Sequence, residues 1–390
     1  MTRSHLGHVL IAPDKFKGTL TAAAVAAHVA AGMERARPGL RTVRVPVADG
    51  GEGTVDAAGS AGYRRVVLSV SGPTGEPLRA AFAVGEGTAI IESAQAAGLG
   101  RLPGGLPAPL AASSRGVGEL VLAAAGIGAK RIVLGLGGVA STDGGAGLVT
   151  ALGARLLDES GAELPPGGAA LARLSRIDLS GFRDLAGTEV IVATDVDNPM
   201  LGARGAAAVY APQKGASPQD VVRLELGLAR WATVAERALG RASRDRPGAG
   251  AAGGLGFAAL AFLGATTRPG IDLMLDLVSF GARLDGARLV VTGEGAIDAQ
   301  TLHGKAPAGV ARASAARAPG VPVIAVAGTC SLSPGQLRSA GIARAYTLAD
   351  IEPDAARCRE QAGPLLEQVA GHIARDWIDE TTLRTARLPK

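Results

Sequence analysis

Short runs of β-branched and aliphatic residues alternate along the chain with alanine- and leucine-rich segments of helical length. This order is typical of a mostly parallel sheet covered by helices, so the pattern predicts an α/β fold. The clearest strands are expected over residues 8–12, 131–136, 189–193, 288–292 and 322–327, each followed closely by glycine, aspartate or threonine. Because ligands of open α/β sheets bind beyond the carboxyl ends of the strands, we expect the chemistry in these post-strand loops.

Two other segments depart from this alternation. Residues 64–92 contain apolar runs on both sides of a turn at residues 73–76, which predicts antiparallel hairpin strands and a change of domain. Near the end, apolar residues recur on one helical face and predict a packed C-terminal helix: Leu365, Leu366, Val369, Ile373 and Trp377. The tail over 381–390 is expected to be mobile.

Composition narrows the class of protein. A chain of 390 residues that is 47% hydrophobic and 19% charged is expected to be a folded protein of two domains, with a cleft between them. Aromatic residues make up 3%, and the net charge of +5 is spread without basic runs, which argues against nucleic-acid binding. Cys330 and Cys358 lack metal-ligand spacing, as expected of a reduced cytoplasmic protein without structural zinc.

One segment is long enough to suggest a membrane span, because no charged residue lies between Arg246 and Arg268. Six glycines interrupt it, and backbone groups in such a loop could not be satisfied in lipid. We therefore predict a buried helix behind a glycine loop and no membrane association.

The positions of the lysines along the chain suggest phosphate binding. Nearly all basic residues are arginine, and four of the six lysines lie in motif-like loops: Lys15, Lys17, Lys214 and Lys305. An ammonium group is a compact charge that can follow a phosphate during transfer, so these positions suggest phosphate contacts; solvated surface lysines are the alternative.

The first two post-strand loops carry carboxylates beside helix starts. APDKFKGTLTA contains Asp14 and leads into a helix that begins at Thr19 or Thr21. The free N–H groups in the first turn of this helix could hold an anion. VADGGEGT supplies Asp49, Glu52 and the flexible pair Gly50 and Gly51, which could approach phosphate or Mg²⁺ closely. The alternative in each case is a capped turn.

The third loop, GLGGVASTDGGAG, formally matches the dinucleotide fingerprint at Gly135, Gly137 and Ala140. The match carries little weight, since a chain with 57 glycines produces the same pattern at Gly248, Gly250 and Gly253 without a preceding strand. Polar residues in this loop suggest hydrogen bonding to a phosphate or hydroxyl instead. We take the following as nucleotide-binding candidates here: Gly137, Gly138, Ser141 and Asp143.

The fourth loop places Asp195 and Asp197 directly after a strand, with Lys214 downstream. A carboxylate beside the accepting hydroxyl can orient it and take its proton late in phosphoryl transfer, and Asp195 is the preferred candidate for this role. For Asp197 an Asx-turn is the competing interpretation.

The fifth loop, TGEGAIDAQTLHGKA, carries Glu294, Asp298 and Lys305. It fails the Walker pattern, because Ala299 replaces the first glycine and Ala306 stands where Ser or Thr is needed. A magnesium ion would therefore be held by carboxylates such as Glu294 or Asp298.

Six blocks together resemble the type 1 glycerate kinase family, in that family's order and across residues 8–374. They are IAPDKFKGTLTA, VADGGEGTVDAA, GLGGVASTDGGAGLVTALGA, ATDVDNPMLGARGAAAVYAPQKGA, GAGAAGGLGFAAL and TGEGAIDAQTLHGKAPAGVA. One departure is Lys15, where many relatives carry serine, so Lys17 is the firmer candidate for a shared phosphate ligand.

The resemblance implies an ATP- and Mg²⁺-dependent kinase of D-glycerate that gives 2-phosphoglycerate, or 3-phosphoglycerate. It also implies a Rossmann-like three-layer domain built from both chain ends (1–66 and 285–390), with a mixed-sheet α/β domain inserted (67–284) and the active-site cleft between them. A monomer or homodimer is expected.

The residue roles follow as a hypothesis. Asp195 orients and deprotonates glycerate, Lys17, Lys214 and Lys305 bind phosphates, and Glu294 with Asp298 holds Mg²⁺. Two other classes remain open: a nicotinamide-dependent hydroxy-acid dehydrogenase, based on GLGGVA after a strand, and a non-catalytic sensor of a phosphorylated metabolite.

Overall fold

The computed structural model describes residues 7–378, and these form two compact units. Unit 1 consists of residues 7–49, 56–61 and 271–378, and unit 2 of residues 50–55 and 62–270. The sequence suggested divisions after residues 66 and 284. The later division differs because Ile271, Met274 and Phe280 are buried in a core of unit 1. The tail expected to be mobile, 381–390, lies outside the described residues.

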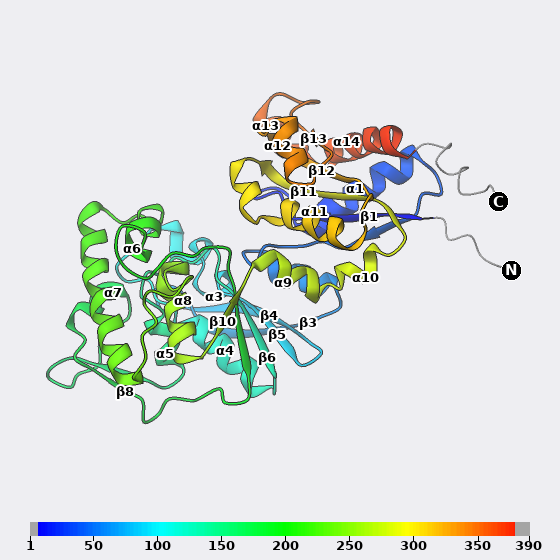
Figure 1. The fold of residues 1–390 in the computed structure, drawn as a ribbon. Helices are drawn as coiled ribbons and strands as arrows, with labels where there is room; N and C mark the ends of the chain where they lie inside the picture. Colours follow the sequence, from blue (N-terminus) through cyan, green and yellow to red (C-terminus); the bar gives the residue numbers. More distant parts are fainter. Residues whose placement is uncertain (1–6, 379–390) are drawn as a thin grey trace. The chain divides into compact units, whose positions relative to one another are not determined.

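Unit 1 is built around a parallel sheet of five strands in the order β13-β12-β11-β1-β2. The strands are β1 (His8–Pro13), β2 (Thr42–Arg44), β11 (Ala287–Ile297), β12 (Val323–Cys330) and β13 (Arg344–Thr347). Figure 1 shows the consequence for the chain: β1, in blue, lies beside β11, in yellow, so the two ends of the sequence form one sheet.

Helices cover both faces of this sheet. They are α1 (Ala22–Ala36), α2 (Thr54–Ser60, which begins in unit 2), α9 (Gly270–Leu277), α10 (Phe280–Leu284), α11 (Ala306–Arg317), α12 (Pro334–Ser339), α13 (Ala355–Glu360) and α14 (Ala362–Trp377), with the 3-10 turn η5 (Ala299–His303). One core joins the sheet to α1 and α14, and a second joins it to α9, α10, α11 and α12. Every residue of β1 is buried, as expected for a strand covered on both faces.

Unit 2 contains a mixed sheet of six strands in the order β10-β9-β6-β5-β4-β3. The strands are β3 (Arg64–Ser71), β4 (Pro77–Gly85), β5 (Thr88–Glu92), β6 (Arg131–Gly135), β9 (Glu189–Ala193) and β10 (Thr266–Arg268). Strands β5, β6, β9 and β10 are parallel, whereas β3, β4 and β5 form the predicted antiparallel hairpins. A separate two-stranded sheet pairs β7 (Arg155–Leu157) with β8 (Arg176–Asp178).

The α-helices of unit 2 are α3 (Ala94–Ala97), α4 (Arg115–Gly126), α5 (Ala146–Ala151), α6 (Ala206–Tyr210), α7 (Pro218–Leu239) and α8 (Ala251–Phe262). Four 3-10 turns accompany them: η1 (Leu99–Arg101), η2 (Pro103–Gly105), η3 (Gly168–Arg173) and η4 (Pro212–Lys214). The uncharged segment before Arg268 forms α8, which is buried along its length, as predicted.

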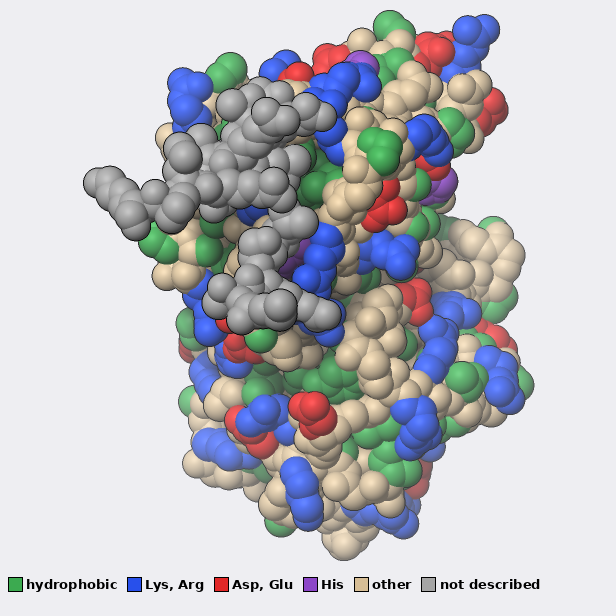
Figure 2. Space-filling model, turned by 90° about the vertical axis from the view of Figure 1, so that its right-hand side faces the viewer, with side chains coloured by type: hydrophobic (Ala, Val, Ile, Leu, Met, Phe, Trp, Pro, Cys, Tyr) green, Lys and Arg blue, Asp and Glu red, His purple; other side chains and the backbone are tan. Residues whose placement is uncertain are grey.

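The fold class is confirmed: two α/β units, one with a parallel and one with a mixed sheet. In the part of the chain that the structure describes, no helix is long and apolar enough to cross a membrane. Basic and acidic side chains intermingle over the face shown in Figure 2, with no continuous basic field.

Candidate active site

The sheet of unit 1 has a topological switch between β1 and β11. Strand β1 continues through α1 on one face to β2, whereas β11 continues through α11 on the other face to β12. The two strands are parallel neighbours, with Pro13 opposite Gly293. Such a switch leaves a crevice beyond the carboxyl ends of the strands, where α/β proteins bind ligands. Asp14 and Glu294 occupy this position.

The carboxylates at the switch repel one another. Asp14 is 7% exposed, and its pKa is raised to about 7, mainly by burial and next by the charge of Asp49, with a further contribution from Glu294. Lys15 opposes the shift through its charge and through its backbone N–H, which donates to Asp14 Oδ1 at 2.6 Å. Burial also raises the pKa of Glu294. The cluster is therefore one that a bound cation would stabilise.

The Thr301 hydroxyl in η5 and the Lys305 ammonium just before α11 complete the cluster. Lys305 Nζ lies 3.5 Å from Glu294 Oε2 and 3.8 Å from Asp298 Oδ1, and the Thr301 hydroxyl donates to Glu294. Asp298 also caps η5, accepting from the N–H of Gln300 at 2.8 Å. The fifth loop thus brings its three predicted residues together.

Lys17 belongs to the same end of the sheet. A Cβ on Gly295 would lie 3.4 Å from the backbone nitrogen of Lys17, so the first loop passes directly over the end of β11. The Lys17 side chain is exposed, and α1 begins after Thr21, whose hydroxyl accepts from the N–H of Ala24 at 3.2 Å. Of the two predicted caps, Thr21 is the one used.

The donor set fits a magnesium ion that is shared with substrate phosphates. Among the side chains that the structure describes, no three carboxylates, histidines or cysteines are placed to hold a metal by themselves. Mg²⁺ commonly binds through one or two carboxylates, several waters and the phosphates of its substrate. Burial raises the pKa values of both Asp14 and Glu294, and a bound cation would lower them again by favouring the charged carboxylates.

In unit 2 the predicted glycines let two loops pack backbone to backbone. A Cβ on Gly135 would lie 2.1 Å from the carbonyl oxygen of Gly50, and one on Gly137 would lie 2.8 Å from Gly51 Cα. Gly50 and Gly138 also have φ values of +89° and +76°, which favour glycine. These residues therefore shape the carboxyl edge of the second sheet, where Glu52 is exposed.

Asp143 is buried beneath this edge and its oxygens are fully used. Oδ2 accepts from the N–H and the hydroxyl of Ser114, at 2.8 and 2.9 Å, and from the N–H of Gly147 at 3.1 Å. Oδ1 accepts from the N–H of Gly145 at 3.1 Å. This carboxylate fixes the start of α5 and joins it to α4.

Lys214 lies next to the same loop and is 4% exposed. Its Nζ donates to the carbonyl oxygen of Ser141 at 2.5 Å and lies 3.4 Å from Thr142 Oγ1. Burial lowers the pKa of Lys214 to about 8, against the opposing charge of Asp143. The Ser141 hydroxyl is buried and has no hydrogen-bond partner among the described residues.

Asp195 follows β9 at the exposed carboxyl edge of this sheet. Its Oδ1 accepts from the N–H of Gly270 at 3.1 Å, which ties it to the segment after β10. Asp197 is more remote from the strand and pairs with Arg204 at 2.9 Å in an exposed ion pair. Of the two predicted aspartates, Asp195 is therefore the one that the sheet positions.

Comparison with known proteins identifies the family. A model of the glycerate kinase family matches residues 9–378. The chain belongs to the glycerate kinase family. It is 45% identical to the glycerate kinase of Bacillus subtilis (strain 168), over 94% of this chain and 96% of the relative. It is 43% identical to the glycerate 2-kinase of Escherichia coli (strain K12), over 87% and 90%.

A solved structure agrees. The chain superposes on a crystal structure from Salmonella typhimurium LT2 that carries the provisional name glycerate kinase 2, with a TM-score of 0.82 and 38% identity, covering 98% of this chain and 99% of that one. The resemblance noted in the sequence is therefore confirmed at the level of family and fold.

Two residues at the carboxyl edge of the sheet of unit 2 were not predicted as site candidates from the sequence. Glu92 ends β5 and is 1% exposed; its Oε2 accepts from the N–H groups of Gly53 and Val55, at 3.0 and 3.3 Å. Arg268 ends β10, opposite Ala193 at the end of β9. The segment containing Glu92 predicted only a hairpin strand, and β10 is too short to give a strand signal.

Proposed function

We propose that this protein transfers the γ-phosphoryl group of ATP to a hydroxyl of D-glycerate, giving ADP and 2-phosphoglycerate. The observation that carries the proposal is the charge cluster of Asp14, Glu294 and Lys305 at the switch point of unit 1. Membership of the glycerate kinase family supports the substrate. The name of the Escherichia coli relative, glycerate 2-kinase, supports 2-phosphoglycerate as the product.

In this proposal unit 1 binds the triphosphate. Lys17 and Lys305 neutralise the phosphate oxygens, and Glu294 and Asp298 would hold Mg²⁺, with Asp14 and Asp49 within its field. Bound Mg²⁺ would supply charge neutralisation of the phosphate oxygens during transfer. Lys305 already lies within 4 Å of both carboxylates, so small movements exchange its partners from carboxylate to phosphate.

Asp195 acts on the acceptor. Its carboxylate is exposed at the carboxyl edge of the sheet of unit 2 and is oriented by the N–H of Gly270, so it can accept a hydrogen bond from the glycerate hydroxyl. As the new O–P bond forms and the bond from the γ-phosphorus to the β,γ-bridging oxygen breaks, the hydroxyl proton passes to Asp195. The electron pair of the broken bond leaves on ADP.

The remaining predicted residues of unit 2 position the loops in this proposal. Gly50, Gly51, Gly137 and Gly138 allow close packing at the sheet edge, and Asp143 holds α5. Ser141 and Glu52 remain predictions as nucleotide contacts. So does Lys214 as a phosphate ligand, since its Nζ would have to leave the carbonyl of Ser141.

Steady-state ADP release from ATP, Mg²⁺ and D-glycerate tests the activity, and phosphorus NMR of the product identifies the hydroxyl. We expect ADP and 2-phosphoglycerate in equal amounts. NADH formation from a hydroxy acid would instead indicate the dehydrogenase. A ligand-induced rise in melting temperature without ADP release would indicate the sensor.

Asp195→Asn tests the assigned base. Loss of the proton acceptor should lower kcat by about a hundredfold or more, with little change in the KM for ATP. The matched control is Asp197→Asn, which removes the same charge two residues away and should keep kcat within about threefold. Near-full kcat in Asp195→Asn would assign the base to another group.

A further inference from the structure

An open groove of about 780 Å³ lies between α11 and α12 in unit 1. Its lining comes from three short stretches: Leu302 in η5, residues 308–315 of α11, and residues 333–341 in and after α12. This volume lies in the range of small-molecule sites.

Small residues give the groove its depth. Ala308, Ala311 and Ala315 recur at spacings of three and four, so they share one face of α11. Ala308 and Ala311 are buried, and a Cβ on Gly341 would lie 3.4 Å from that of Ala311. A flat ring could therefore rest on methyl groups and backbone.

Polar groups stand along the exposed rim. Gln336 and Ser339 project from α12, and Arg312 from α11, where its guanidinium is held by Asp272 at 2.5 Å. A small-residue floor with amide, hydroxyl and guanidinium groups at the rim suits an aromatic heterocycle with hydrogen-bonding edges and an attached sugar.

One end of the groove is lined by residues that neighbour the charge cluster in sequence. Leu302 follows Thr301, whose hydroxyl contacts Glu294, and Ala308 lies one turn after Lys305, whose ammonium lies 3.5 Å from Glu294. The same η5–α11 corner thus forms one end of the groove and one side of the cluster. A molecule bound in the groove could place an anionic end against Lys305.

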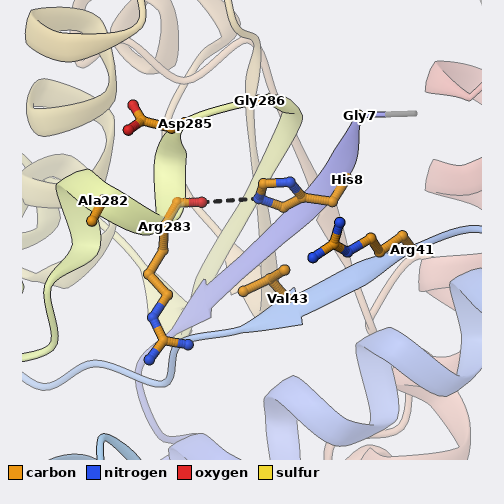
Figure 3. Close-up of a pocket in the computed structure, with 8 residues that line it drawn as sticks. All are labelled: Gly7, His8, Arg41, Val43, Ala282, Arg283, Asp285 and Gly286. Atoms are coloured by element: carbon orange, nitrogen blue, oxygen red, sulfur yellow. Dashed lines mark hydrogen bonds between the residues drawn. The ribbon is translucent and has the colours of Figure 1, made fainter. Parts of the chain in front are cut away.

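A second cavity of unit 1, of about 550 Å³, lies away from the charge cluster. It is lined by His8, Arg41, Arg283 and Asp285, which surround the start of the sheet (Figure 3). These residues precede or begin β1, β2 and β11, at the edge of the sheet opposite Asp14 and Glu294. A nucleotide base bound there could not extend its phosphates to Lys305.

We propose that the groove between α11 and α12 binds the adenosine part of ATP, with the phosphates directed past Leu302 to Lys305. This inference rests on the proposed kinase function, since it assigns the nucleotide to the charge cluster. It names a site for the base that is separate from every residue assigned to the chemistry.

Calorimetric titration with MgADP and with magnesium pyrophosphate distinguishes the contribution of the adenosine part to binding from that of the phosphates. Ala315→Phe and Ser339→Phe fill the groove from exposed positions, and Ala282→Phe adds the same ring to the second cavity as a control. We expect each groove variant to weaken MgADP about tenfold or more, with pyrophosphate affinity within about twofold of the wild type. Ala282→Phe should change neither.

Photolabelling of the wild-type protein with 8-azido-ATP, followed by peptide mapping, covers the case in which the variants fold poorly. Label on residues 302–315 or 333–341 supports the proposal. Label elsewhere, or groove variants with unchanged MgADP affinity, overturns it. Failure of the kinase function is a separate result, because the wild-type protein would then release no ADP with D-glycerate.

Discussion

Each unit of this protein places carboxylates and a lysine in loops that follow parallel strands, yet the two sets differ in how their charges are satisfied. In unit 2, Asp143 accepts four hydrogen bonds and Lys214 donates to Ser141, so these buried charges hold the loops in place. In unit 1, burial raises the pKa values of Asp14 and Glu294; the charge of Asp49 raises that of Asp14 further, whereas Lys305 and Thr301 oppose the rise at Glu294.

This difference in how buried charges are satisfied distinguishes scaffold residues, which stabilise the fold, from site residues, which act on a ligand. A buried charge whose hydrogen-bonding capacity is filled rigidifies the fold, whereas buried like charges cost stability until a ligand neutralises them. Similar sequence motifs therefore predict similar chemistry in both units, but the buried carboxylates with raised pKa values lie in unit 1. Substitutions should separate the two, because a scaffold residue affects unfolding and a site residue affects turnover.

The largest effect is expected for Glu294→Gln. Loss of this charge should lower kcat/KM for ATP by about a thousandfold, which corresponds to about 4 kcal/mol. The melting temperature should change little, since relief of the repulsion with Asp14 offsets the loss of the ion pair with Lys305. Steady-state kinetics and thermal unfolding are measured together, with the exposed Glu189→Gln as the control. A stable Glu294→Gln protein with full turnover would remove Glu294 from the site.

Asp143→Ala should lower the stability of the protein, unlike Glu294→Gln, which should lower turnover. It leaves the N–H groups of Ser114, Gly145 and Gly147 buried without acceptors, which should lower the free energy of unfolding by about 3 kcal/mol. Urea unfolding in a Trp377→Phe background measures this, because Trp231 then reports on unit 2 alone.

The control for this measurement is Asp158→Ala, which removes an aspartate from an exposed turn of the same unit. Its cost should stay below about 1 kcal/mol. If both variants lost the same free energy of unfolding, the buried hydrogen bonds of Asp143 would stabilise the protein no more than the exposed ones of Asp158.

The smallest effect concerns Lys214. Its pKa is about 8 in the folded protein and near the ordinary value of 10.5 when unfolded, so between these values the unfolded chain binds more protons. The free energy of unfolding should therefore rise with pH, by about 2 kcal/mol from pH 7.5 to 9.5. Urea unfolding of the wild type is compared with Lys214→Met, in which this rise should be absent. If the free energy of unfolding depended on pH in the same way in both proteins, the pKa of Lys214 would not be lowered in the folded protein, which would contradict this account.

Much of the fold could be predicted from sequence, because its signals are local. Strand runs such as residues 189–193 are bounded by turn residues, and the apolar runs over 64–92 flank a turn at residues 73–76. The pairing of β1 with β11 has no local signal, since nearly 280 residues separate their partners. The resemblance to a family implied it, and local pattern alone did not.

The candidate site was predicted less completely, for a physical reason. Residue type and loop position marked Asp14, Glu294 and Lys305, but the same criteria marked Asp143 and Lys214. Only the tertiary structure shows which oxygens already accept hydrogen bonds. Glu92 went unnoticed because its burial against the N–H groups of Gly53 and Val55 depends on loops that are distant in sequence. The assigned roles, including Asp195 as base, and the cytoplasmic location stay predictions.

The most direct test of the contrast is the rise in melting temperature on adding MgADP, measured for the wild type, Asp143→Ala and Glu294→Gln. At a hundredfold excess over Kd, binding should raise the melting temperature of the wild type by about 5 °C. Asp143→Ala should start lower and keep this rise, whereas Glu294→Gln should start near the wild-type value and lose most of it. A full rise in Glu294→Gln together with none in Asp143→Ala would contradict the assignment of site and scaffold.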